Sequence, residues 1–446
     1  MKGRQKLMKV NDKKIYLLAQ ENVGIALLKL GIPTMIGMMI SALYNLVDSY
    51  FVGKLGTAQI GAVSVVYPLS LVVLGLGLLF GAGASSYLAR LLGKGKKEEA
   101  DKGASTALAA SVLTGVVIVV FMLIFINPIL KYLGATDSIM PYAREYAIPF
   151  ISGLAINVFN ITLNNIITAE GASFYGMIAM LLGGICNMFL DPLFIFSLNM
   201  GVRGAAAATL ISRLISSAIY ISYLLSGKSN FTFAFTNICF KKKIFVEIFK
   251  IGVPMLVYQI LCSVAMTITN HEASIYGDSA VAAFGIVNRI ITFGAQMLTG
   301  FLKGYQAFVG YNFGAGKPER VKEATKKMII GSTIACLAAA VILIFARTQI
   351  IHAFSQNDAE VMKIGTKILI ISAIDIIGMG YMMVHNFRFM GLGKAKEGAI
   401  ISVARQGIFF IPIILILSHV FGLNGVIVSQ FAADVCSYIM VVVYIA

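Results

Sequence analysis

The sequence predicts an all-α integral membrane protein with twelve transmembrane helices, arranged as two six-helix bundles related by a pseudo-two-fold axis. Three observations predict this fold. Apolar residues make up 58% of the 446 residues and charged residues only 13%, whereas a soluble domain averages about 25% charged. Long apolar segments recur along the chain, and the sequence repeats itself at a spacing of 221 residues. We expect the two bundles to form a V whose opening exposes a central cavity.

The internal repeat defines the domain organisation. Residues 29–33 (KLGIP) return as 250–254 (KIGVP), and residues 93–96 (GKGK) return as 314–317 (GAGK). The offset hardly drifts, so two copies of one unit fill almost the whole chain. We therefore divide the chain into a cytoplasmic N-terminal segment, an N-lobe, a cytoplasmic linker and a C-lobe, at residues 1–24, 25–226, 227–248 and 249–446.

Each lobe holds six apolar segments that are long enough to cross a bilayer, which takes about 20 residues as a helix. Both lobes then run parallel rather than inverted, a build typical of secondary transporters. The expected spans, in order, are residues 25–50, 58–88, 104–126, 141–168, 174–198, 203–226, 249–276, 280–311, 326–347, 362–390, 398–418 and 424–446.

The distribution of charge predicts the orientation in the membrane. Basic residues crowd the N-terminal segment and every second connection after it, except the connection at 169–175, whose only charged residue is Glu170. The opposite connections hold few basic residues: Lys54, Lys131, Arg203 and Arg347. This positive-inside bias predicts a multi-pass protein of the cell inner membrane with both termini in the cytoplasm. The net charge of +16 therefore reflects membrane topology and not a nucleic acid partner.

The sequence lacks the motifs of an enzyme or of a nucleotide-driven pump. Its five cysteines are scattered without CxxC spacing, and none of its four histidines belongs to an HExxH motif. No P-loop signature is present, so ATP is not the direct energy source. We expect neither enzymatic activity nor a resident cofactor or structural metal.

Four carboxylates lie well inside apolar spans: Asp48, Asp191, Asp375 and Asp434. Ionisable groups at membrane depth are costly and mark a functional site by default. Asp48 and Asp191 belong to the N-lobe, and their repeat mates are Thr269 and Pro412. Because the C-lobe did not keep these two acids, we expect a coupling site in the N-lobe.

Polar neighbours accompany both N-lobe acids. Tyr44 precedes Asp48 by four residues, and Asn187 precedes Asp191 by four, so each pair shares one helical face. The sixth span adds Thr209 within a run of small residues that lets a neighbouring helix approach. Two carboxylates in a low-dielectric pocket repel each other, so a proton is a natural ligand. Ionised together beside amide and hydroxyl oxygens, they could instead hold Na⁺.

Several segments resemble motifs of the multidrug and toxic compound extrusion (MATE) family, including bacterial MepA-like members. Residues 43–56 (LYNLVDSYFVGKLG) resemble its first-helix signature and residues 187–195 (NMFLDPLFI) its fifth-helix motif. Residues 310–316 (GYNFGAG) and 405–406 (RQ) resemble second-half motifs, and the resemblance covers nearly the full chain. The family implies an antiporter that expels organic cations and other drugs in exchange for inward H⁺ or Na⁺.

The resemblance also implies roles for individual residues. The family's N-lobe cation site corresponds here to four cation-coupling residues: Asp48, Asn187, Asp191 and Thr209. We assign four further residues to the substrate cavity: Tyr44, Tyr146, Asn164 and Asp375. The NorM branch of the family carries a seventh-helix Glu where this chain has Cys262 or apolar neighbours, so the resemblance implies no sodium site in the C-lobe.

Two alternatives remain open. We favour H⁺ over Na⁺ as the coupling ion. A lipid-linked oligosaccharide flippase of the same superfamily would share the architecture, but its cavity should carry more cationic groups to meet pyrophosphate. We expect a monomer surrounded by membrane lipids, with small organic cations as cargo. We also expect Asp434 to pair with Arg405, because both lie on the last two spans.

Overall fold

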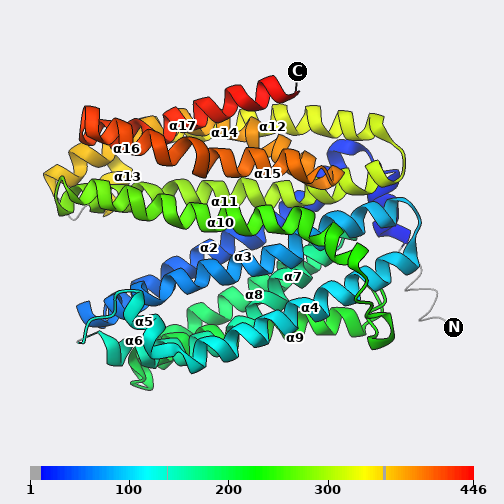
Figure 1. The fold of residues 1–446 in the computed structure, drawn as a ribbon, viewed down its shortest axis with the longest axis horizontal. Helices are drawn as coiled ribbons and strands as arrows, with labels where there is room; N and C mark the ends of the chain where they lie inside the picture. Colours follow the sequence, from blue (N-terminus) through cyan, green and yellow to red (C-terminus); the bar gives the residue numbers. More distant parts are fainter. Residues whose placement is uncertain (1–11, 138, 355–357, 446) are drawn as a thin grey trace.

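A computed structural model describes residues 12–137, 139–354 and 358–445 of this chain. These residues form helices, turns and loops, and none of them lies in a β-strand. Figure 1 shows two helical bundles side by side, which approach each other near the N-terminal end and diverge toward the opposite end. The expected V-shaped pair of bundles is therefore confirmed.

Helices of the N-lobe follow the expected spans. In chain order they are α2 (Val23–Gly53), α3 (Thr57–Gly93), α4 (Lys97–Ile124), the short α5 (Ile126–Tyr132), α6 (Met140–Ser152), α7 (Leu154–Ala169), α8 (Ser173–Pro192) with the π-helical turn η1 (Leu193–Ser197), and α9 (Gly201–Leu225).

The linker contains the short 3₁₀ turn η2 (Phe235–Asn237). The C-lobe then consists of α10 (Lys242–Ser274), α11 (Asp278–Gly314), α12 (Pro318–Phe345), the short α13 (Arg347–Phe354), α14 (Ala359–Leu392), α15 (Ala395–Val403), the π-helical turn η3 (Ala404–Phe409), α16 (Phe410–Phe421) and α17 (Leu423–Ile445).

Among the described residues, eleven helical spans are long and apolar enough to cross a membrane, and the bent pair α6–α7 makes a twelfth. The pair corresponds to the span expected at 141–168. It is broken at Gly153 with a bend of 43°. Pro149 lies one turn before the break, where its ring excludes a backbone N–H from the helical ladder.

The 221-residue repeat is visible in the helix boundaries. α3 begins at Thr57 and α11 at Asp278, while α4 begins at Lys97 and α12 at Pro318. Even the short helices α5 and α13 begin at matching positions, Ile126 and Arg347. Two homologous units have thus folded to the same plan, with two main differences. α14 is continuous where α6 and α7 are broken, and the π-helical turn follows α8 in the N-lobe but interrupts the equivalent span of the C-lobe between α15 and α16.

The two lobes touch closely at one end of the molecule, which we call the closed end. A Cβ added to Gly93 would lie 2.0 Å from the carbonyl oxygen of Tyr311, and one added to Gly314 would lie 2.1 Å from that of Arg90. Only glycine permits such a crossing of two backbones. Arg90 also forms an ion pair of 3.2 Å with Glu247 across the lobes.

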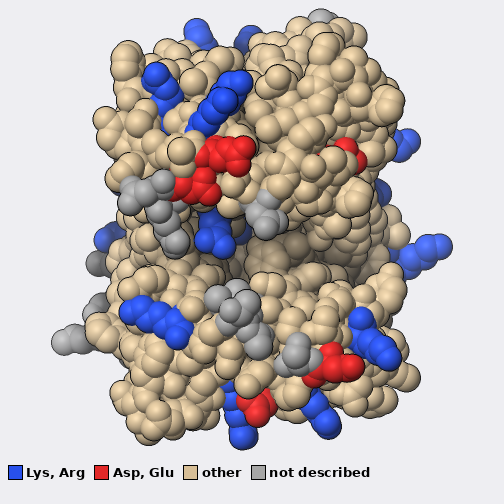
Figure 2. Space-filling model, turned by 90° about the vertical axis from the view of Figure 1, so that its left-hand side faces the viewer, with Lys and Arg blue, Asp and Glu red and all other residues tan. Residues whose placement is uncertain are grey.

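The opposite end, which we call the open end, is hollow between the lobes. Figure 2 looks onto this end and shows a depression that runs between the two bundles. A Cβ added to Gly285 or Gly294 of α11 would meet no atom within 4 Å. The structure is therefore open toward one side of the membrane and closed toward the other.

A helical segment at residues 12–19 bridges both lobes at the closed end. Lys14 donates a hydrogen bond of 2.7 Å to the Tyr223 hydroxyl and lies 3.8 Å from the Glu170 carboxylate, both in the N-lobe. Leu18 accepts a hydrogen bond of 3.0 Å from Asn312 in the C-lobe. Burial raises the pKa of the Glu170 carboxyl and lowers the pKa of the Lys14 ammonium, while their attraction opposes both shifts.

Candidate functional site

Glycines bring α2 and α8 into close contact and so define where the site forms. A Cβ on Gly184 would lie 2.8 Å from Ile40 and 3.3 Å from the Tyr44 ring. A Cβ on Gly37 would lie 2.9 Å from the sulfur of Met180. Small residues permit this approach in membrane bundles, where close packing holds helices together. The next turns of both helices, toward the open end, carry the acids.

Asp191 occupies a break in helical geometry. It precedes Pro192, which ends α8, and the π-helical turn η1 follows directly. Proline cannot donate to the helical ladder, and π-helical turns are frequent at functional sites. The side chain of Asp191 is fully buried, at 0% exposure. The local sequence thus places a carboxylate inside the lobe next to loosened backbone.

Asn187 forms hydrogen bonds with two of the other three predicted coupling residues. Its side-chain Nδ2 donates a hydrogen bond of 3.2 Å to Oδ1 of Asp191 and one of 3.5 Å to Oγ1 of Thr209. Asn187 is 1% exposed and Thr209 is 8% exposed. The fifth and sixth spans of the N-lobe therefore meet at a buried polar group, as the sequence predicted.

Asp48 on α2 completes the group. Its charge interacts with that of Asp191, and the buried Tyr146 on α6 interacts with both carboxylates and with Tyr44. Three buried oxygens at this site have no hydrogen-bond partner among the described residues: Oδ1 of Asp48, Oδ2 of Asp191 and Oδ1 of Asn187. Buried acceptors without a donor are costly, so the arrangement favours a proton or cation as ligand.

Arg213 is the member that the sequence reasoning missed. It lies on α9, four residues after Thr209 and therefore on the same helical face. Its charge interacts with Tyr44, Tyr146 and Asp48. An arginine inside an apolar span is as informative as a carboxylate there, so the sequence does carry a signal for Arg213.

Two predicted cavity residues lie away from the acid pair. Asn164 on α7 donates a hydrogen bond of 2.9 Å to the Tyr220 hydroxyl, and no hydrogen bond of its side chain reaches a coupling residue. Asp375 on α14 instead faces Asp434 and Arg405 in the C-lobe. Tyr44 and Tyr146 are the two predicted cavity residues that the structure brings to the acids.

The C-lobe holds its own buried ion pair, and here the predicted pairing is confirmed. Arg405, in the turn η3, donates from Nε and Nη2 to the two carboxylate oxygens of Asp434, at 2.8 and 2.6 Å. Gln430 donates a third hydrogen bond of 2.8 Å to the same carboxylate. This two-pronged geometry is the strong form of a charged hydrogen bond.

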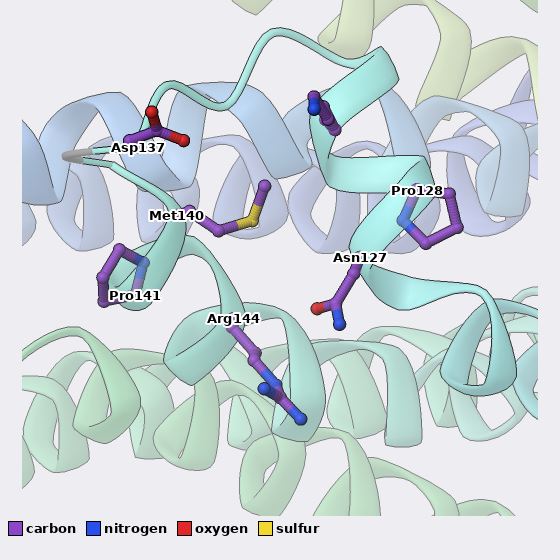
Figure 3. A pocket seen from close by; sticks show the side chains of 7 residues that line it. Asn127, Pro128, Asp137, Met140, Pro141 and Arg144 are labelled. Carbon is purple, nitrogen blue, oxygen red and sulfur yellow. The ribbon is translucent and has the colours of Figure 1, made fainter.

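A separate hollow lies at the open end of the N-lobe. Figure 3 shows residues of α5 and α6 facing each other across it, with Asp137 on the connection between them. Its volume is about 580 Å³, and its lining includes none of the four predicted coupling residues. It is an open surface hollow rather than a buried polar site. Among the described residues, no group of three or more His, Cys, Asp or Glu side chains could hold a metal ion.

Comparisons with known proteins identify the family. The family model MatE matches residues 33–193 and 254–416, one match in each lobe. The chain is 30% identical to the multidrug export protein MepA of Staphylococcus haemolyticus over 98% of this chain and 96% of that protein. It is 29% identical to the MepA of Staphylococcus saprophyticus, over 98% and 97% of the two chains.

The fold agrees with solved structures of the same family. One is described as the outward-facing conformation of a multidrug resistance MATE family transporter of the MOP superfamily. It matches with a TM-score of 0.92 at 28% identity, over 97% of each chain. The repeat, the twelve spans, the open V and these matches lead to one conclusion: the chain belongs to the MATE family of membrane transporters.

Proposed function

We propose that this protein is a proton-coupled antiporter that exports small organic cations and other drugs by alternating access. The observation that carries the proposal is the pair of Asp48 and Asp191, each of which has one buried carboxylate oxygen without a hydrogen-bond donor among the described residues. A proton and a cationic drug would compete for this negative site. Protonation removes its attraction for the drug on the outside, and loss of the proton to the cytoplasm restores it. A ligand shifts the two states only through its different affinities for them.

The proposal assigns an orientation to the structure. Basic residues gather at the turns of the closed end, including Lys94, Lys96 and Lys317, so this end faces the cytoplasm of a cell inner membrane. Both termini then lie in the cytoplasm, with the lobes and linker divided as expected from the repeat. In this orientation the open end faces outward, and we expect the protein to act as a monomer. The acids of the N-lobe site favour cationic cargo over the anionic cargo of a lipid-linked oligosaccharide flippase.

The first prediction concerns the coupling ion. Purified protein in proteoliposomes should transport a cationic dye under an imposed pH gradient at constant Na⁺. Asp48→Asn and Asp191→Asn should each reduce this transport to that of protein-free vesicles, because each removes a carboxylate that exchanges proton for drug. Both variants should keep the monodisperse elution of the wild type.

A matched control variant tests whether the loss of transport is specific to the acids of the N-lobe site. Asp137→Asn changes an exposed carboxylate outside the acid group and should transport as the wild type does. Transport that follows an Na⁺ gradient and ignores pH would overturn the proton assignment and leave the same four residues as a sodium site. Full activity of either site variant would remove the acids from the coupling mechanism.

A further inference from the structure

Arg213 lies in a niche that the break between α6 and α7 creates. Its guanidinium stacks over the Phe150 ring, 5.0 Å from the ring centre. A Cβ on Gly153 would lie 3.4 Å from its Nη1, so the guanidinium packs directly against the break. Asn160 on α7 donates a hydrogen bond of 2.9 Å to the Arg213 carbonyl and fixes the backbone. The arginine is therefore held by packing and not by a charged partner.

The guanidinium has no hydrogen-bond partner at two of its nitrogens. Nε and Nη1 of Arg213 are buried and unsatisfied, and so is Oδ1 of Asp48. The charges of Arg213 and Asp48 interact, yet no ion pair forms between them within 4.0 Å. A cation and an acid thus interact electrostatically without forming an ion pair, which contrasts with the two-pronged pair of Arg405 and Asp434.

The charged and titratable groups near Arg213 and the two acids set the net charge of the site. They are Tyr44 and Asp48 on α2, Tyr146 on α6, Asp191 on α8 and Arg213 on α9, while α7 contributes the uncharged Asn160. Tyrosines are neutral at ordinary pH, and an arginine stays protonated. With both acids ionised, the site carries one net negative charge.

We propose that Arg213 is the specificity-determining residue of this site, because its fixed charge balances Asp48 and leaves room for only one further positive charge. Asp191 then takes up a single proton, or the site takes up one monovalent organic cation. The exchange is one proton for one monovalent cation and moves no net charge. This inference rests on the proposed antiport and adds its stoichiometry and the charge class of its cargo.

Proteoliposomes with a clamped K⁺ diffusion potential test the charge count. Ethidium, a monovalent cation, is the probe, and protein-free vesicles give the passive uptake to be subtracted. If one proton exchanges for one ethidium, the membrane potential does not change the steady-state ratio of inside to outside ethidium that the protein establishes. Exchange of two protons for one ethidium changes this ratio about 50-fold for each ~100 mV, since one charge moved across ~100 mV corresponds to about 2.3 kcal/mol. We expect the unchanged ratio for the wild type.

Two substitutions at Arg213 and one control complete the test. Arg213→Gln leaves two acids without a fixed cation, so its ethidium ratio should follow the potential, whereas Arg213→Lys should keep the wild-type insensitivity. Arg203→Gln removes an exposed arginine of the same helix and should have no effect. If Arg213→Gln does not fold, the response of the wild type and of Arg213→Lys to the membrane potential still tests the proposal.

The outcomes separate this inference from the proposed function. A wild-type ratio that follows the potential, or an Arg213→Gln ratio that ignores it, overturns the role of Arg213 while proton-driven transport stands. A wild type that shows no response to any pH gradient overturns the antiport itself.

Discussion

The two lobes share one fold, yet their buried charges are arranged differently. In the C-lobe, Asp434 receives hydrogen bonds from Arg405 and Gln430, and each of its oxygens is satisfied. In the N-lobe, Asp48 and Asp191 each keep one buried oxygen without a donor. Satisfied buried charges hold helices in place, whereas unsatisfied ones are available to a ligand. The comparison supports the proposal that the N-lobe group binds a ligand, and it favours a structural role for the ion pair of the C-lobe.

The internal repeat identifies the equivalent positions at which the buried charges of the two lobes differ. Arg213 and Asp434 occupy equivalent positions, 221 residues apart, on the last helix of each lobe. One lobe thus places a cation where the other places an acid. Asp434 pairs with Arg405 in the turn η3 of the preceding span, while the N-lobe position equivalent to Arg405 is Gly184, inside the helix α8. The two groups therefore differ in charge at several equivalent positions, including Asp48 and Asp191, whose repeat mates are Thr269 and Pro412.

The largest predicted difference between the two lobes concerns the free energy of unfolding. Arg405→Met should destabilise the protein by about 3–5 kcal/mol, because it leaves the Asp434 carboxylate buried and uncompensated. Arg213→Gln should cost less than about 1 kcal/mol, because its guanidinium forms no ion pair with any described residue and its removal relieves a desolvation cost. Thermal unfolding of the detergent-solubilised variants measures both. Equal losses would show that the two arginines play equivalent structural roles.

A double substitution sharpens the same contrast. Arg405→Met combined with Asp434→Leu should recover about 2 kcal/mol relative to Arg405→Met alone, since no unpaired charge is left at position 434. Proton-driven transport by the double variant should persist at a temperature where it is folded. Loss of transport in a well-folded double variant would place the C-lobe pair in the mechanism.

The smallest expected effect concerns Thr209 and its repeat mate Gln430. Gln430→Leu removes a hydrogen bond of 2.8 Å to a charged group and should cost about 1.5–3 kcal/mol. Thr209→Val removes only the long hydrogen bond from Asn187 and should cost about 0.5–1 kcal/mol. Transport should respond in the reverse order, falling in Thr209→Val and not in folded Gln430→Leu. The reverse pattern would assign coupling to the C-lobe.

Most of the architecture could be predicted from the sequence, because hydropathy and repetition are properties of the chain itself. The bilayer requires long apolar helices, and the repeat maps one lobe onto the other. The break at Gly153 was less evident, since Pro149 permits a bend without requiring one. Its consequence, a niche for the Arg213 guanidinium, depends on packing between helices that are far apart in sequence.

Part of the candidate site could also be predicted from the sequence, because residue spacing along a helix determines which side chains share a face. The spacing of Tyr44 to Asp48 and of Asn187 to Asp191 places each pair on one face, and both faces meet as expected. Which acid finds a partner cannot be read from spacing along one helix. Asp375 and Asp48 are both acids in apolar spans, yet only the first lies beside an ion pair.

The segment at residues 12–19 has a consequence for the order in which the protein assembles. It is made first, but part of its docking place, including Asn312 and the Phe308 and Tyr305 side chains around Leu18, is made only after some 300 residues have been synthesised. Its other contacts, at Glu170 and Tyr223, become available with the first lobe. Residues 12–19 therefore reach their final place only when the second lobe has been translated and inserted, so docking of this segment reports completed biogenesis.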